Sequence, residues 1–344
     1  MKKNNLIIIS LLLLYSCNNN SVEFPFGVFD DSITVEPAKI INLENYNILD
    51  ATSTIRYKGW TFFREHGDKQ KIFKAISADY TRTIEFINIG NGPCDVSKFT
   101  SMYINDDSLF IYDPNLRKIL NIVIVDDSVN VSYYREFTGR TPELIPLDKD
   151  RFLSLDLYDS SFFKIVDYND SSYFKHPYLQ DEILSNLEFL SQNTIYGNCY
   201  FTISPSKNKI AFGLMNLGKY GFGEIISNDS ICFNEILSYY PLKIGKIIDK
   251  CVVPARDNIT NIFSAASSDD YVFFLHLGDV YDGFSVYPRR ILVYTWDGKP
   301  YKIINFKKNP NLVDLHYDAE RNLLYGIGYA PECQYVEINL DGIL

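Results

Sequence analysis

Short apolar runs recur along the whole chain, rich in Ile, Val, Phe and Tyr and separated by Asp, Asn and Gly. This pattern is typical of many short β-strands. Only one segment, residues 181–192, has convincing helical spacing, with Ile183, Leu184, Leu187 and Leu190 on one face. The pattern therefore predicts an all-β protein that contains one helix.

The predicted strands also fall into groups. Runs that end in a turn residue before another strand recur every 43 to 69 residues, and they end at Asp79, Asp126, Asn169, Asn228, Asp297 and Asp341. A unit of four strands fits around each of them, most clearly over residues 98–137 and 259–308. Units of four strands at this period are typical of a β-propeller, and six of them fill the chain. A β-sandwich or two stacked barrels is the alternative, which the regular spacing disfavours.

The last predicted unit has only three strands before the chain ends. Residues 33–43, near the N-terminus, have strand character and are expected to supply the fourth strand. Closing the ring in this way leaves no open sheet edge between the two termini. We therefore predict one six-bladed β-propeller domain over residues 32–344, preceded by a tether over residues 18–31.

Residues 1–17 resemble a bacterial lipoprotein signal peptide. Two lysines precede an apolar stretch at residues 6–14, which is too short to span a bilayer comfortably. Leu14 lies three residues before Cys17 and the small Ser16 lies directly before it, which is the order of a lipobox. Lipidation of the Cys17 thiol would anchor the mature protein to a membrane. A plain signal peptide, in which Cys17 is incidental, is the alternative.

The residues directly after Cys17 indicate which membrane leaflet anchors the protein. They are neutral, and the first acidic residue is Glu23. Lipoproteins displayed outward in some Gram-negative groups carry acidic residues immediately after the cysteine. The sequence therefore favours the inner leaflet of the outer membrane.

The net charge bears on possible partners, and the cysteine content bears on disulfides. The formal net charge is −10, and removing residues 1–17 makes it −12 because Lys2 and Lys3 are lost. With no run of Lys or Arg longer than two, nucleic-acid binding is disfavoured. Five cysteines remain after Cys17, an odd number without close pairs, so we expect mostly buried free thiols. One disulfide is the alternative.

Two further sequence segments resemble those of the TolB-like six-bladed β-propeller lipoproteins of the Bacteroidota. The first contains Gly90, Gly92 and Pro93 before a strand that ends in Ile-Tyr-Asp at 111–113, and the second is RRILVYTWDGKPYKIINF at 289–306. The resemblance implies an envelope-anchored binding module. It brings no catalytic residues and no cofactor.

A binding face can be proposed from the lengths of the connections. In a propeller, the connections between strands two and three of a blade, and those between blades, lie on one face, and nearly every long predicted connection is of this class. Long insertions on one face of a repeat protein usually mark its binding face. Aromatic, Arg and Asp residues there are candidate contacts for an envelope protein, a peptide or a glycan: Tyr220, Phe222, Tyr281, Asp282, Phe284, Tyr287, Arg289 and Arg290. Alternatively, the aromatic side chains fold back and cap the ring.

Catalytic signals are sparse. The sequence has no GxSxG, HExxH, Walker A or paired CxxC motif, and it has no calcium-loop pattern. We therefore predict a non-catalytic binding or scaffold module, with no cofactor and no metal ligands assigned. A metal-dependent, lactonase-like hydrolase with an axial site is the alternative, because His66 falls in a predicted face loop, His276 near the end of a second strand and His316 on an inner strand.

Overall fold

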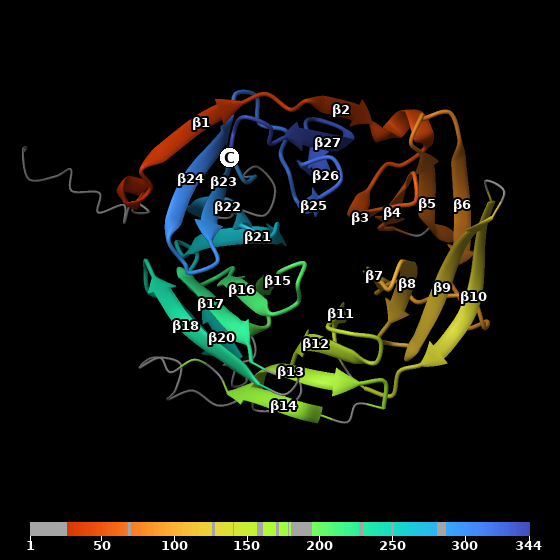
Figure 1. The fold of residues 1–344 in the computed structure, drawn as a ribbon, viewed down its shortest axis with the longest axis horizontal. Coiled ribbons are helices and arrows are strands. Elements are labelled where there is room, and N and C mark those ends of the chain that lie inside the picture. Colours follow the sequence, from red (N-terminus) through yellow and green to blue (C-terminus); the bar gives the residue numbers. More distant parts are fainter. Residues whose placement is uncertain are drawn as a thin grey trace, which may run out of the picture.

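The protein is a ring of six blades around a central channel (Figure 1). Each blade has four antiparallel strands that run outward from the axis, which confirms the predicted all-β, six-bladed propeller. The predicted helix at 181–192 lies outside the described residues. The computed structural model describes residues 26–67, 70–125, 128–139, 141–156, 161–169, 172–177, 179, 195–226, 230–248, 251–280 and 287–344.

The first three blades follow one another along the chain. The first blade contains β3 (Ala51–Tyr57), β4 (Trp60–Glu65), β5 (Lys71–Ser77) and β6 (Thr83–Asn88). The second contains β7 (Ser101–Asn105), β8 (Ser108–Asp113), β9 (Lys118–Val125) and β10 (Ser128–Glu136). The third contains β11 (Ile145–Pro146), β12 (Arg151–Leu155), β13 (Ser161–Asp167) and β14 (Ser172–Pro177).

A small hairpin separates the fourth blade from the fifth. The fourth blade contains β15 (Cys199–Ile203), β16 (Lys209–Leu214), β17 (Lys219–Ile225) and β18 (Ile231–Ser238). The hairpin is formed by β19 (Ile244–Ile248) and β20 (Cys251–Pro254). The fifth blade contains β21 (Ile259–Ser267), β22 (Tyr271–Val280), β23 (Arg290–Thr295) and β24 (Pro300–Phe306).

The N-terminal segment closes the ring by joining two blades. The sixth blade contains β25 (His316–Asp318), β26 (Leu323–Tyr329) and β27 (Cys333–Asn339), and β2 (Lys39–Asn42) pairs antiparallel with β27 as its outer strand. This is the predicted closure. The upstream strand β1 (Asp31–Val35) instead adds to the fifth blade, parallel to β24. Two 3₁₀ turns flank these strands, η1 (Phe26–Val28) and η2 (Leu43–Tyr46).

The core lies between the blades. Among the described residues, six clusters of buried apolar side chains each join two neighbouring blades, and the cluster around Phe63 and Tyr335 joins the first blade to the last. Because both faces of a blade are covered, its middle strands are almost wholly buried, as in β13 and β16. The exposed residues concentrate on outer strands such as β10. This explains why the middle strands appear in the sequence as continuous apolar runs.

Tight turns form one end of the channel. Lys58 and Gly59, which join β3 to β4, have φ values of 46° and 76°, and Asp106 and Asp107, which join β7 to β8, have φ values of 46° and 59°. Two-residue hairpins favour turns with positive φ at both central positions, because their twist matches that of the strands. We call this end of the ring the short-turn face. Consecutive strands alternate in direction, so the β22–β23 connection lies at the opposite end.

Four cysteines are free thiols, namely Cys94, Cys199, Cys232 and Cys333. Cys199 and Cys333 are buried, as expected, whereas Cys94 is half-buried and Cys232 is exposed. Residues 1–17, with the predicted lipidation site Cys17, lie outside the described part of the chain. Within that part, no helix is both long and apolar enough to cross a membrane.

The ring closure can be tested with two neighbouring residues of β2. Ile41 packs against the core cluster between the last and first blades, whereas Ile40 is 50% exposed. We expect Ile41→Asp to lower the free energy of unfolding by about 2–4 kcal/mol, because it removes apolar burial and places a carboxylate in an apolar cluster. Ile40→Asp is the matched control and should change it by less than about 1 kcal/mol. Equal effects in urea denaturation would show that β2 does not hold the closure.

Candidate axial binding site

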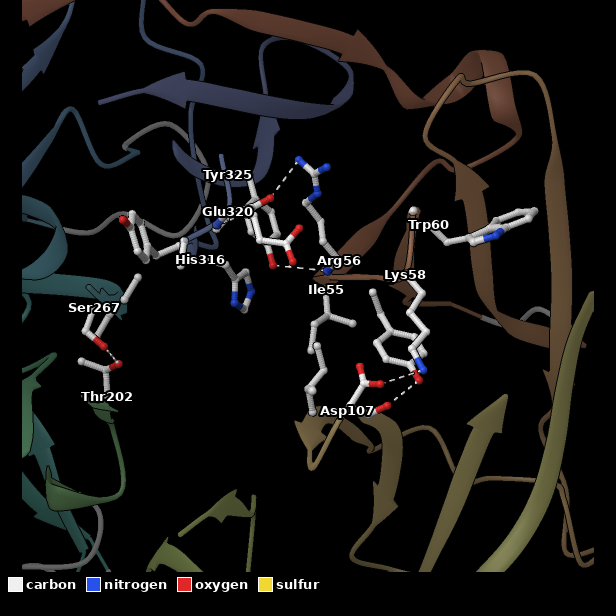
Figure 2. Close-up of a pocket in the computed structure, with 18 residues that line it drawn as sticks. Ile55, Arg56, Lys58, Trp60, Asp107, Thr202, Ser267, His316, Glu320 and Tyr325 are labelled. Atoms are coloured by element: carbon white, nitrogen blue, oxygen red, sulfur yellow. Dashed lines mark hydrogen bonds and ion pairs between the residues drawn. The ribbon is translucent and has the colours of Figure 1, made fainter. Parts of the chain in front are cut away.

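A pocket of about 580 Å³ opens at the short-turn face, where the inner strands of the blades converge (Figure 2). Its lining comes from the first, second, fourth, fifth and sixth blades, so the pocket exists only in the closed ring. Arg56 and Tyr325 lie on one side of it, and Lys58 and Asp107 lie on another. We call this pocket the axial mouth.

Arg56 connects the first blade to the last at one side of the axial mouth. Its Nη1 atom lies 3.3 Å from Asp318 Oδ2 and 3.1 Å from Glu337 Oε1. Glu337 is buried and also accepts hydrogen bonds from the guanidinium of Arg321 and the hydroxyl of Tyr335. A buried carboxylate is tolerated when it is paired and hydrogen-bonded in this way. These contacts fix the Arg56 guanidinium in place.

The opposite rim is solvated. Lys58 Nζ lies 3.1 Å from Asp107 Oδ2, and their side chains are 49% and 82% exposed. The Tyr57 hydroxyl donates to the backbone carbonyl of Asp107 at 2.9 Å, which joins the first two blades. An exposed ion pair contributes little to stability, so Lys58 and Asp107 can exchange partners at low cost.

His316 and Asp314 form a pair farther into the channel. His316 Nε2 lies 2.8 Å from Asp314 Oδ2, and the imidazole stacks on the Tyr325 ring at 5.3 Å between centroids. Burial opposes the charged imidazole, but the Asp314 carboxylate outweighs it through charge and hydrogen bonding and raises the pKa of His316. Asp314 also accepts from the backbone amides of Thr54 and Leu315. The Asp314 carboxylate therefore has hydrogen-bond partners in His316 and in two backbone amides.

A second cavity, of about 530 Å³, continues the channel toward the other end of the ring. It shares Ile104, Thr202, Ala265 and His316 with the axial mouth, so the two cavities meet at that level. We call it the axial chamber. Glu143, which precedes β11, lines the chamber, and burial raises the pKa of its carboxyl to about 7.

The structure corrects the assignment of two residues to the long-connection face. Tyr220 and Phe222 lie in β17 and are buried in the core between the fourth and fifth blades. Their rings contact Phe274 and Tyr294. Because β17 has both faces covered, these two side chains fill the core and cannot contact a partner.

The other candidates lie near the β22–β23 connection. Arg289 is exposed, and Tyr287 is half-buried. Arg290 begins β23, and its guanidinium lies 4.3 Å from the centre of the Phe26 ring. The remaining candidates, Tyr281, Asp282 and Phe284, lie outside the described residues.

Sequence analysis missed most of the axial mouth. Asp107, Arg56 and Lys58 stood out in no motif, whereas His316 was named as a candidate for an axial site. The available signal was the recurrence of charged residues at the first turn of each blade, since those turns encircle the axis. Among the described residues, no three His, Cys, Asp or Glu side chains are grouped so that they could share a metal ion.

Comparisons with known proteins identify the fold alone. No protein family and no curated protein matches the chain. A Bacteroides fragilis protein described as exported aligns with a TM-score of 0.56 and 9% identity, over 90% of this chain and 98% of its own. The extracellular domain of a one-component system from B. thetaiotaomicron gives 0.49 and 8%, over 90% of this chain and 43% of that one. The Cps50 (Swd1) β-propeller domain from Myceliophteria thermophila gives 0.48 and 6%, over 88% and 98%.

The enclosed carboxyl of Glu143 predicts a pH dependence of stability. A carboxyl whose pKa is raised on folding favours the folded state at low pH, and this contribution is lost as pH rises from about 4.5 to about 7. Allowing for solvent in the chamber, we expect Glu143→Gln to be more stable than the wild type by about 1–2 kcal/mol at pH 8 and equal to it at pH 4. Chemical denaturation at the two pH values measures this. A constant difference would assign the effect to packing instead.

Proposed function

We propose that this protein is a lipid-anchored, non-catalytic binding module of the bacterial cell envelope. Its partner docks at the axial mouth, on the short-turn face of the propeller. The partner is an envelope protein, a peptide or a glycan. The anchor is the lipidated Cys17, and the outer membrane is the expected location. The predicted tether over residues 18–31 ends before Phe26, because Phe26–Val28 form η1, Phe29 packs in the core and β1 begins at Asp31.

The observation that carries the proposal is the composition of the axial mouth. Tyr57, Tyr317 and Tyr325 line a concave pocket together with the charged groups of Arg56 and Lys58. Arg and Tyr are the side chains that most often anchor partners at protein interfaces. Rigid inner strands hold the pocket, which lowers the entropy lost when a partner is ordered there.

The cell-envelope location rests on different support. The lipobox-like order Leu14 to Cys17 belongs to exported proteins of bacteria. The fold is shared with a Bacteroides fragilis protein that is itself described as exported. The phrases at residues 90–113 and 289–306 resemble those of TolB-like propeller lipoproteins from the same phylum.

Charge-reversal variants on the two faces test whether the partner binds at the axial mouth or at the long-connection face. We expect the double variant Lys58→Glu/Glu320→Lys to lose capture of the partner in a cross-linked pull-down from native envelopes, because both side chains line the mouth. Both changes are on the surface and should leave the fold intact. Arg289→Glu, at the other end of the ring, is the control and should capture the partner at the wild-type level.

Two outcomes would contradict parts of the proposal. Loss of capture in Arg289→Glu alone would move the binding site to the long-connection face. A Cys17→Ala variant that still sediments with membranes and captures the same partner would show that the lipid anchor is dispensable. Circular dichroism of each variant verifies that the propeller is folded.

A further inference from the structure

The axial chamber is a polar cavity at the centre of the ring. Residues from all six blades line it, including Thr52, Ser101, Ile145, Phe201, Ser264 and Asp314. A cavity of this size with hydroxyl and carboxyl groups on its wall is large enough for part of a small ligand. The axial mouth opens into it at the level of His316.

Among the described residues, the carboxyl of Glu143 has no hydrogen-bond or ion-pair partner in this chamber. Within the part of the chain that the structure describes, its backbone carbonyl accepts from Ser154 and Thr141, but its carboxyl forms no hydrogen bond and no ion pair. An enclosed carboxylate without a counter-ion is unfavourable, so such a group takes up a proton or binds a cation. Nearby Cys199 cannot act as a counter-ion, because a thiol is either neutral or negative. Burial and the negative charge of Glu143 both raise its pKa, which favours the neutral thiol.

The other charges along the channel do not compensate Glu143. In the chamber, Asp314 is paired with His316. At the axial mouth, Asp318 is paired with Arg56 and Asp107 with Lys58. Glu320 adds one further carboxylate to the rim.

Within the described chain, the unpaired carboxylates along this route, Glu143 and Glu320, therefore favour a cation. Asp269, Asp270 and Asp318 lie close enough to Tyr317 to raise its pKa, after the larger effect of burial. Among the side chains that line the mouth, the carboxylates of Asp107, Asp318 and Glu320 outnumber the cations of Arg56 and Lys58 by one, and tyrosine rings at the entrance can contact an incoming cation.

We propose that the axial channel binds a protonated primary amine on a flexible chain, with the Glu143 carboxylate as its counter-ion. The hydroxyl groups of the chamber accept the remaining ammonium hydrogens. This inference rests on the proposed function, because the axial mouth is the route of entry. The amine belongs either to a lysine side chain of the partner or to a small diamine, and both present the same ammonium group.

Calorimetric titration of the full-length protein with pentane-1,5-diamine at pH 8 tests the proposal. We expect the diamine to bind the wild type, and Glu143→Gln to weaken its affinity by about tenfold or more, because the charge-assisted hydrogen bond is lost. Glu320→Gln, the matched change at the rim, should weaken it by less than about threefold. Pentane-1,5-diol has the same length without charge and should not bind.

The outcomes separate this inference from the proposed function. Equal affinity of the wild type and Glu143→Gln, or equal binding of the diol, overturns the amine assignment and leaves water or a neutral ligand in the chamber. An acetylated, amidated Gly-Gly-Lys-Gly-Gly peptide that binds more tightly than the diamine assigns the amine to a protein partner, and the reverse order assigns it to a small molecule. If Glu143→Gln still captures the envelope partner and the mouth double variant does not, the amine inference fails and the proposed function stands.

Discussion

Closure of the ring is the constraint on which the rest of this structure depends. A four-stranded blade has two apolar faces, and each face is buried only when a neighbouring blade covers it. Five of the six interfaces form between blades that are adjacent in sequence. The sixth joins the two ends of the chain, where β2 completes the last blade and the chain then enters β3. Loss of that interface would expose two blade faces at once.

The closing interface also positions functional groups. Glu337, in β27, lies at the centre of a set of donors that includes Arg56 from the first blade and Arg321 from its own. Removing a carboxylate and a guanidinium from water is costly, so such a network contributes more to geometry than to stability. Its effect is to hold Arg56 at the axial mouth. The same closure brings Asp314 against the Thr54 amide of the first blade.

The sequence contained enough information for the fold but little for the site. Turn residues at a regular period predicted six blades, because each blade repeats the same local pattern of strands. The parallel pairing of β1 with β24 was not predictable, since no tight turn joins parallel strands and no local signal marks their register. Lys58, Asp107 and His316 are far apart in the sequence, and only the closed ring brings them to one pocket. Tyr220 and Phe222 were misplaced because a strand, β17, runs where the prediction placed a long connection. In the structure, Gly221 packs directly against Phe212, where a Cβ atom would lie 2.0 Å from the ring.

The axial residues differ from those of the long-connection face in what they do for the fold. Arg290, at the end of a long connection, covers the ring of Phe26 and so has a packing role. Glu143 has no such packing role among the described residues, since its carboxyl links no two strands. Its enclosure raises the pKa of that carboxyl. A glutamine would fill nearly the same space without the cost of an enclosed charge. Groups that lower stability without holding the fold together are expected at functional sites. This contrast favours the proposed site at the axis, where Glu143 lines the chamber, over one at the long-connection face.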